Sequence, residues 1–183
     1  MKIIITAIVV LTVIMFFMPY FTINFAIIEE AEIVGESQEV VETLTANVSG
    51  MKLFSAMGNN FFVLIFLLLA PLYALISLIR SINNSIFGGL YANLSGTFVV
   101  GIILTTIHFF WVQTHLITDF TPVTFHAALE IFGVDTIQNA EWRDYATPYI
   151  TSILPSFGFI ITIALYAVGI LLCGYFAKKG VAE

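Results

Sequence analysis

The stretch FFVLIFLLLAPLYALISLI, from Phe61 to Ile79, runs for nineteen residues without a charged side chain. The hydrocarbon core of a bilayer is about 30 Å thick, and a helix needs about 20 apolar residues to cross it. This stretch therefore predicts a transmembrane helix. Three more stretches have a similar length and composition, so we predict four spans, at about residues 3–21, 61–79, 94–116 and 150–176.

The composition of the whole chain agrees with a membrane protein. Of its 183 residues, 60% are hydrophobic and 10% are charged, whereas a soluble domain has about 25% charged residues. A mean hydropathy of +1.02 is too high for the apolar side chains of so short a chain to be hidden in one globular core. We therefore predict a membrane all-α fold, a four-transmembrane-helix bundle, in which residues 1–183 form one integral membrane domain.

The basic residues predict the orientation of the spans, because Lys and Arg gather on the cytoplasmic side. With a cytoplasmic N-terminus, four of the six basic residues lie inside and eleven of the twelve acidic residues lie outside. The inside group is Lys2, Arg80, Lys178 and Lys179, and the outside pair is Lys52 and Arg143. We expect both termini in the cytoplasm, the plasma (inner) membrane as the location, an inner loop at 80–93, and outer loops at 22–60 and 117–149.

The first outer loop is too long for a simple turn and carries two segments in which apolar and polar residues alternate. These are TINFAII (22–28) and EVVETLTANVSG (39–50), separated by a polar stretch that contains a glycine. Alternation and β-branched side chains on both sides of a turn predict an antiparallel strand pair, with a third short strand at 31–34. Two strands alone are marginally stable in water, so we expect the pair to pack against the second outer loop or a neighbouring subunit.

The outer segments have two further features. Six glutamates give the first outer loop an acidic, solvated surface that repels nucleic acid: Glu29, Glu30, Glu32, Glu36, Glu39 and Glu42. MKLFSAMG (51–58) predicts a short amphipathic turn on the membrane surface, and PVTFHAALEIF (122–132) predicts a short helix that starts after Thr121.

The predicted layout is similar to that of a known family. Four helices with both termini inside, a strand-bearing first outer loop and a smaller second one resemble the claudin topology over the whole chain, a topology that large-pore junction channels share. Claudins also carry a tryptophan and a disulfide-forming cysteine pair in the first outer loop. This chain has neither, since Cys173 is its single cysteine. The resemblance therefore implies a topology and no function.

Two histidine–carboxylate pairs are candidate metal ligands. His115 and Asp119 are four residues apart, as are His126 and Glu130, and residues at this spacing meet on one helix face. Imidazole and carboxylate groups suit zinc, copper or iron, so the two pairs predict a metal site if the fold brings them close. The alternative is two ordinary hydrogen-bonded pairs.

His108 lies about two turns inside the third span. An ionisable residue within the membrane is a candidate functional group that faces the bundle interior. His108 is about 10 Å from His115 along the helix axis, too far for both to bind one metal ion. Haem ligation by His108 needs a second axial ligand, for which Met15, Met18 or a histidine of another subunit is available. The alternative is a hydrogen bond to a neighbouring helix.

The interior of the spans has few other polar features. None of the four carries Asp, Glu, Lys or Arg, which argues against the proton relay of a pump. Small residues predict where helices approach closely: Ala70 with Ala74, Gly96 with Gly101, and Gly169 with Gly174.

Three functions remain. The first is a non-catalytic integral membrane subunit that packs in the bilayer, within a homo- or hetero-oligomeric complex, and presents its acidic outer element to partner subunits. The second is a homo-oligomeric cation channel, which needs a polar stripe such as Thr97, Thr105, His108 and Thr114. The third is a metal- or haem-bearing redox subunit. The sequence carries no catalytic motif, so we rank the first function highest and expect no enzymatic activity of the chain itself, no cofactor and no nucleic-acid partner.

Overall fold

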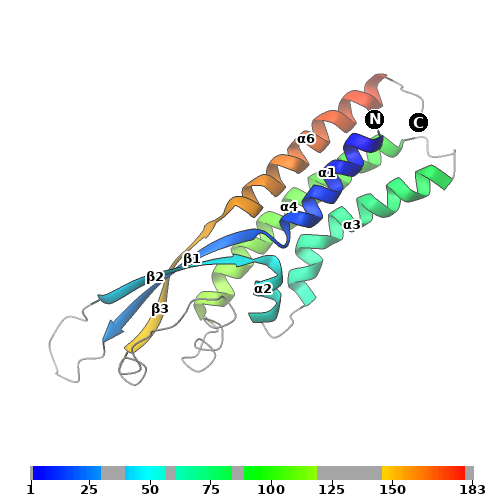
Figure 1. The fold of residues 1–183 in the computed structure, drawn as a ribbon. Helices are drawn as coiled ribbons and strands as arrows, with labels where there is room; N and C mark the ends of the chain where they lie inside the picture. The colour runs from blue at the N-terminus through cyan, green and yellow to red at the C-terminus, as the bar shows by residue number, and fades with distance from the viewer. Residues whose placement is uncertain (1, 30–39, 57–60, 84–88, 119–145, 180–183) are drawn as a thin grey trace.

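The computed structural model describes residues 2–29, 40–56, 61–83, 89–118 and 146–179. In chain order these form α1 (Lys2–Met15), β1 (Pro19–Glu29), β2 (Val40–Ser49), α2 (Gly50–Ala56), α3 (Phe61–Asn83), α4 (Leu90–Thr118), β3 (Ala146–Pro155) and α6 (Phe157–Lys179). Helices α1, α3, α4 and α6 form an elongated bundle, and the three strands extend from one end of it (Figure 1). The start of α1 and the end of α6 lie at the opposite end (Figure 1).

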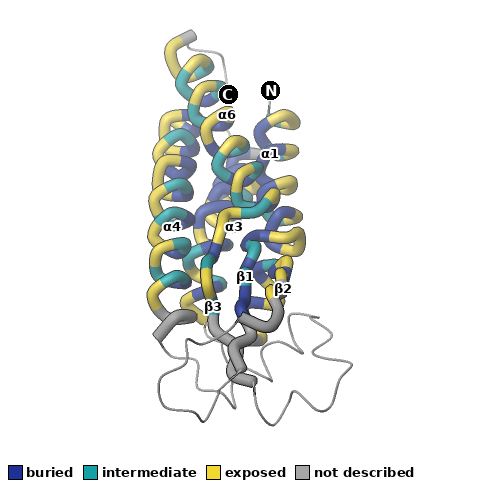
Figure 2. The backbone as a smooth tube through the Cα atoms, turned by 90° about the vertical axis from the view of Figure 1, so that its left-hand side faces the viewer, coloured by how far each residue is buried: buried dark blue, intermediate teal, exposed yellow. Residues whose placement is uncertain are grey.

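Among the described residues, three helices are long and apolar enough to cross a membrane, namely α3, α4 and α6. The qualifying windows are Phe61–Ser81, Leu90–Thr114 and Phe157–Lys178. The outward side of the bundle is exposed along its length (Figure 2), and its exposed side chains include Ile103, Phe110, Ile160 and Leu171. Apolar surface of this extent is rare on soluble monomers, so the helices indicate an integral membrane protein that is mostly helical.

The first predicted span differs from the structure. The sequence predicts a helix over residues 3–21, but α1 ends at Met15 and β1 begins at Pro19. Residues 16–18 form a tight turn, in which the backbone N–H of Met18 donates to the carbonyl of Met15 at 3.1 Å. The physical reason is Pro19, which lacks a backbone N–H and disfavours helical backbone at the residue before it. The apolar run is continuous, yet its last part is strand.

The three strands form one antiparallel sheet in the order β2-β1-β3. The pairing of β1 with β2 confirms the predicted strand pair, with Ile23 opposite Ala46. On the other side of β1, Ile23 lies opposite Ile153 of β3. The sequence places residues 150–155 in the fourth transmembrane helix, and the structure corrects this, because that segment is strand and the helix begins at Phe157. Its β-branched residues favour strand.

Two backbone hydrogen bonds join the turn after α1 and the start of β1 to the beginnings of α2 and α6. The N–H of Gly50 donates to the carbonyl of Phe16 at 2.9 Å, and the N–H of Ser156 donates to the carbonyl of Tyr20 at 3.0 Å. The carbonyl of Ser156 then accepts the N–H of Ile160 at 3.1 Å and so begins α6. The turn after α1 is therefore bonded to the start of α2, and the start of β1 is bonded to the residue before α6.

One hydrophobic core serves the sheet and the adjoining half of the bundle. It combines buried residues of helices and of all three strands: Phe16, Tyr20, Phe21, Ile23, Phe25, Ala46, Val48, Leu53, Val63, Leu67, Val112 and Ile153. Because the same side chains fill both parts and protein interiors are closely packed, we expect the sheet and the bundle to behave as one rigid body.

A second core cluster joins α1, α3, α4 and α6 in the other half of the bundle. Two glycines allow aromatic rings to lie directly on a neighbouring helix. A Cβ added to Gly101 would lie 2.7 Å from the ring of Tyr166, and a Cβ added to Gly169 would lie 2.6 Å from the ring of Phe98. One member of each predicted glycine pair is therefore confirmed as a point of close approach. The prediction is wrong for Gly96 and Gly174, where an added Cβ meets no described atom within 4 Å.

Of three further predicted elements, one is confirmed and two lie outside the described residues. The amphipathic segment after Gly50 is the helix α2, which follows β2 directly. The third short strand at 31–34 and the short helix at 122–132 lie outside the described ranges, so both stay predictions.

Candidate functional site

One face of α4 carries small and polar residues into the bundle. Gly101, Thr105, His108 and Val112 follow one another at spacings of four, three and four residues, which keeps them on one side of a helix. All four are buried, and His108 is 0% exposed. The structure thus places His108 in the bundle interior, as the sequence predicts.

Three aromatic rings surround the imidazole of His108. The distance between ring centroids is 5.7 Å to Phe21 of β1, 6.0 Å to Phe66 of α3 and 6.0 Å to Trp111 of α4. Neither Nδ1 nor Nε2 of His108 has a hydrogen-bond partner among the described residues. Among the described residues, His108 therefore packs against aromatic rings and does not make the hydrogen bond to a neighbouring helix that the sequence offered as an alternative.

Hydroxyl groups gather beside this face of α4. Tyr20 of β1 and Tyr166 of α6 are 2% and 1% exposed. The hydroxyl of Tyr20 lies close to those of Thr105 and Thr162, yet neither threonine oxygen reaches hydrogen-bond geometry with a described residue. We refer to Tyr20, Thr105, His108, Thr162 and Tyr166 as the buried polar cluster.

The polar groups of the buried polar cluster are one imidazole, two phenol hydroxyls and two threonine hydroxyls. Across the described ranges, no three His, Cys, Asp or Glu side chains come together as metal ligands. A haem on His108 would have to displace the rings of Phe21, Phe66 or Trp111.

None of the four predicted metal-ligand side chains is among those that the structure describes. His115 lies near the end of α4, and its side chain is not described. Asp119, His126 and Glu130 lie in the range 119–145, beyond the described residues. Whether these four residues meet is untested, so the metal site stays a prediction.

Sequence reasoning missed three members of the buried polar cluster. Thr162 and Tyr166 are four residues apart on α6, so their common helix face could be read from the spacing. Which residues of α4 they would meet could not be read in this way. Tyr20 is missed because the apolar run before it favours a helix that continues to residue 21, whereas Tyr20 belongs to β1.

A second candidate surface lies on the sheet. Side chains of a strand alternate between its two faces, and in β1 Phe21 and Ile23 enter the core. Thr22 and Asn24, which alternate with them, point to the opposite, outer face. We refer to the hydrogen-bonded side chains on this face as the polar ladder: Thr22, Asn24, Thr45, Asn47 and Ser152.

The polar ladder joins all three strands through side-chain hydrogen bonds. Between β1 and β2, Thr22 Oγ1 donates to Asn47 Oδ1 at 3.0 Å, and Thr45 Oγ1 donates to Asn24 Oδ1 at 3.0 Å. Between β1 and β3, Asn24 Nδ2 donates to Ser152 Oγ at 2.8 Å. Asn24 therefore uses both its amide oxygen and its amide nitrogen, which holds the ladder in one arrangement.

Comparison with protein-family models, with curated proteins and with solved structures gave no match. Two candidate sites in the chain itself therefore bear on its function. The buried polar cluster is enclosed by the bundle, whereas the polar ladder has exposed members, Thr45 and Asn47 among them. The ladder is thus the site that another molecule can reach.

Replacing His108 by Phe should stabilise the fold by about 1 kcal/mol, because a ring then fills the site without two unpartnered nitrogens. His108→Ala should destabilise it by about 2 kcal/mol, since the lost ring contacts outweigh that relief. Thermal unfolding in detergent measures both changes. A His108→Phe midpoint as low as that of His108→Ala would mean that the imidazole makes a required polar interaction, contrary to a packing role.

Proposed function

We propose that the chain is a non-catalytic subunit of a membrane protein complex, and that it docks a partner through its sheet. The observation that carries this proposal is an uncharged, internally hydrogen-bonded polar ladder on a sheet that shares its core with the bundle. In this function the helices anchor the subunit in the bilayer and fix the position and the tilt of the sheet relative to the membrane surface.

The attachment of the sheet supports a docking role. Besides the shared core, Gln113 Nε2 of α4 donates to the carbonyl of Ile153 in β3 at 3.2 Å. Strand β2 leads into α2 with no residue between them, and only Ser156 separates β3 from α6. A surface fixed in this way loses little conformational entropy when it binds, and less entropy loss means tighter binding.

The chemistry of the polar ladder also supports docking. Burying a charged group costs far more than burying an amide or hydroxyl that keeps its hydrogen bond. The ladder residues are uncharged and already bonded to one another, so a partner can cover them at a low desolvation cost. Among the described acids, Glu29 ends β1 and Glu42 pairs with Ile27 near that end. We infer that the acidic first outer loop steers a partner with basic groups toward the sheet end of the molecule.

We further propose that α1 and the start of β1 together form the first of four membrane crossings. The 14 residues of α1 span about 21 Å, less than the bilayer core of about 30 Å. Non-helical backbone is tolerated at membrane depth only where protein surrounds it, and Tyr20 and Phe21 are both almost fully buried. With the basic helix ends inside, both termini lie in the cytoplasm, in a claudin-like topology within the plasma (inner) membrane.

The burial of the interior polar residues favours a subunit over a channel. A pore shared between copies of the chain needs polar side chains on the outside of each bundle. Thr105 and His108 are instead almost fully buried, and Thr97 is 8% exposed, whereas Thr114 is exposed. Three of the four residues of the predicted polar stripe therefore lie inside one chain.

A charge placed on the polar ladder tests the docking proposal. Thr45→Arg should reduce recovery of partner chains with the tagged protein at least tenfold, because Thr45 is exposed and an unpaired guanidinium would have to be buried at the interface. Ser55→Arg is the matched control, since Ser55 is an exposed hydroxyl residue of α2 beyond the ladder. Affinity purification from the native membrane measures recovery, and unfolding midpoints verify that both variants fold. Equal recovery for the two variants would exclude the ladder as the docking face.

A further inference from the structure

A groove of about 530 Å³ opens on the side of the bundle between α3 and α4. Its walls come from both helices: Leu69, Ala70 and Tyr73 of α3, and Ala92, Asn93, Gly96, Thr97 and Val100 of α4. A Cβ added to Gly96 meets no described atom within 4 Å. The absence of a side chain at Gly96 therefore leaves open space in the groove.

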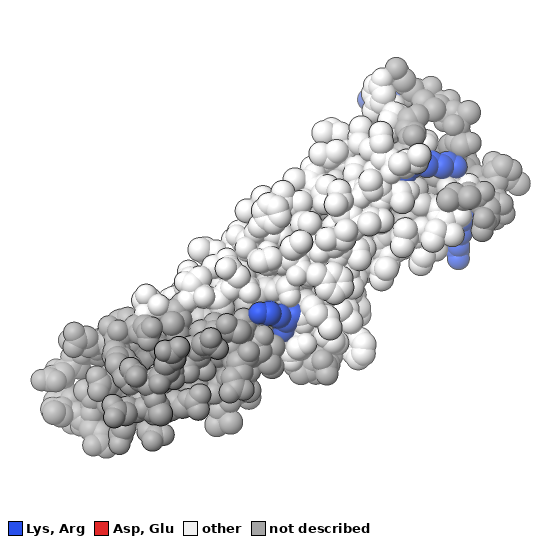
Figure 3. Space-filling model, in the orientation of Figure 1, with Lys and Arg blue, Asp and Glu red and all other residues white. Residues whose placement is uncertain are grey.

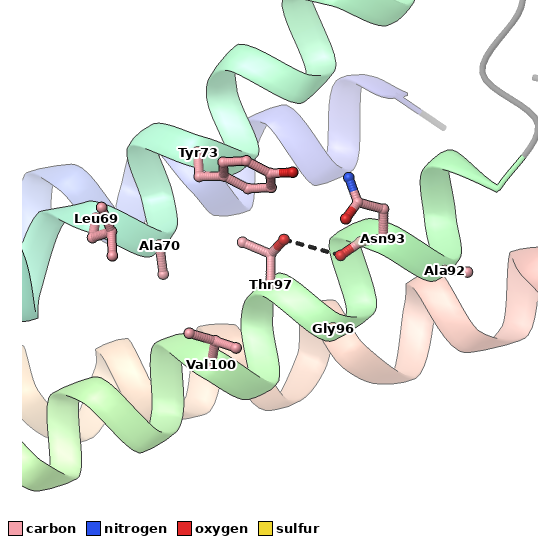
Figure 4. Close-up of a pocket in the computed structure, with 8 residues that line it drawn as sticks. All are labelled: Leu69, Ala70, Tyr73, Ala92, Asn93, Gly96, Thr97 and Val100. Atoms are coloured by element: carbon pink, nitrogen blue, oxygen red, sulfur yellow. Dashed lines mark hydrogen bonds between the residues drawn. The ribbon is translucent and has the colours of Figure 1, made fainter.

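The groove is apolar at one end and polar at the other (Figure 4). Leu69 and Val100 line the part nearer the sheet, whereas the hydroxyl of Tyr73 and the amide of Asn93 lie toward the start of α4. Thr97 Oγ1 donates to the carbonyl of Asn93 at 2.9 Å, so the hydroxyl hydrogen of Thr97 already has an acceptor within α4. A ligand that matches the groove has a hydrocarbon part and a polar group at one end.

Basic residues lie beyond the polar end of the groove. Arg80 follows Tyr73 by seven residues, which places it on the same face of α3, about 10 Å further along the axis. Lys2 Nζ donates to the carbonyl of Ser81 at 3.4 Å, so a second positive charge lies at the same end of α3 as Arg80. These charges and Lys178 belong to the bundle end opposite the sheet, where blue patches appear in Figure 3. The described acids, Glu29 and Glu42, lie in the sheet.

We propose that this groove binds an anionic phospholipid. One acyl chain lies along Leu69, Ala70 and Val100, and the ester region lies beside Tyr73 and Asn93. The phosphate lies near Arg80 and Lys2. Anionic lipids are abundant in the cytoplasmic leaflet, where each nearby Lys or Arg contributes about 1 kcal/mol of attraction.

The length of the groove favours a lipid over a partner helix. From Ala92 to Val100 it runs along nine residues of α4, about 12 Å between the first and the last, which is less than the thickness of one leaflet of a core of about 30 Å. A transmembrane helix of a partner would run along the whole of α3 and α4. The groove instead ends within the leaflet that contains the basic residues, as an acyl chain does.

Filling the groove tests the lipid site. Gly96→Phe adds a ring in the open space, and Gly174→Phe is the matched control, because an added Cβ at Gly174 in α6 also meets no described atom within 4 Å. Native mass spectrometry in detergent, with phosphatidylglycerol and phosphatidylcholine at equal concentration, counts the bound lipids. We expect the wild type and Gly174→Phe to retain phosphatidylglycerol and Gly96→Phe to retain at least tenfold less, with unchanged unfolding midpoints. Equal retention by both variants would overturn the site.

Removing the charge tests the headgroup assignment. Arg80→Gln should lower the preference for phosphatidylglycerol over phosphatidylcholine about fivefold, whereas Lys52→Gln in α2, near the sheet, should leave it unchanged. A wild type that binds the two lipids equally would overturn the anionic part of the proposal. Loss of a second polypeptide from Gly96→Phe, with lipid binding intact, would assign the groove to helix docking instead. Lipid binding is independent of the sheet, so a chain that retains lipid but lacks partners supports this inference and contradicts the proposed function.

Discussion

Ile23→Asp is expected to unfold the sheet end of the molecule. Ile23 is 0% exposed and lies in the central strand, opposite Ala46 of β2 and Ile153 of β3. A carboxylate there would be buried without a partner, and an uncompensated buried charge destabilises a fold by about 3–5 kcal/mol. We expect little folded protein after extraction, measured by size-exclusion chromatography and by the thermal midpoint of unfolding.

The residue before Ile23 provides the control for this prediction. Thr22 points to the polar ladder, where its hydroxyl donates to Asn47. Thr22→Asp puts the same charge one residue away but on the outer face, so its effect should stay below about 1 kcal/mol. Equal destabilisation by the two variants would contradict the assignment of the two faces of β1.

Gly158→Val should destabilise the protein by about 3 kcal/mol or more, because overpacking against backbone cannot relax easily. A Cβ added to Gly158 would lie 2.8 Å from the carbonyl oxygen of Pro19 and 3.1 Å from that of Met15. Both are backbone atoms at the turn between α1 and β1, where the start of α6 packs. The thermal midpoint of unfolding in detergent measures the effect.

Gly174→Val is the control for this steric prediction. Gly174 also lies in α6, but an added Cβ there meets no described atom within 4 Å. This variant should keep a midpoint near that of the wild type, since valine is a somewhat better helix former than glycine. If Gly158→Val were as stable as Gly174→Val, α6 would not pack against the turn as described.

The sequence predicts those helices and strands that depend on the local pattern of apolar and polar residues. Helices α3 and α4 follow from long apolar runs, and the pair of β1 and β2 follows from alternation in two segments that are close in the chain. The third strand could not be predicted in this way. A short apolar segment such as residues 150–155 fits a strand or a buried helix end equally well by composition, and its partner Ile23 is far away in the sequence.

The candidate sites were predictable to different degrees. His108 is identified by its chemistry alone, because an ionisable residue in an apolar span is rare. The polar ladder needs the register of the sheet, since Asn24 meets both Thr45 and Ser152 only once all three strands are aligned. The groove at Gly96 depends on how α3 and α4 are positioned against each other. The small residue Gly96 predicts a close helix contact there, whereas the structure has open space beside it.

The intact mass of the complex, extracted from its native membrane in a mild detergent, tests the proposed function most directly. We predict an assembly heavier than the 20.3 kDa chain, which contains at least one further polypeptide and persists in the Ser55→Arg control but not in Thr45→Arg. A single 20.3 kDa chain, with or without bound lipid, would contradict the proposal that this protein is a subunit of a larger membrane complex.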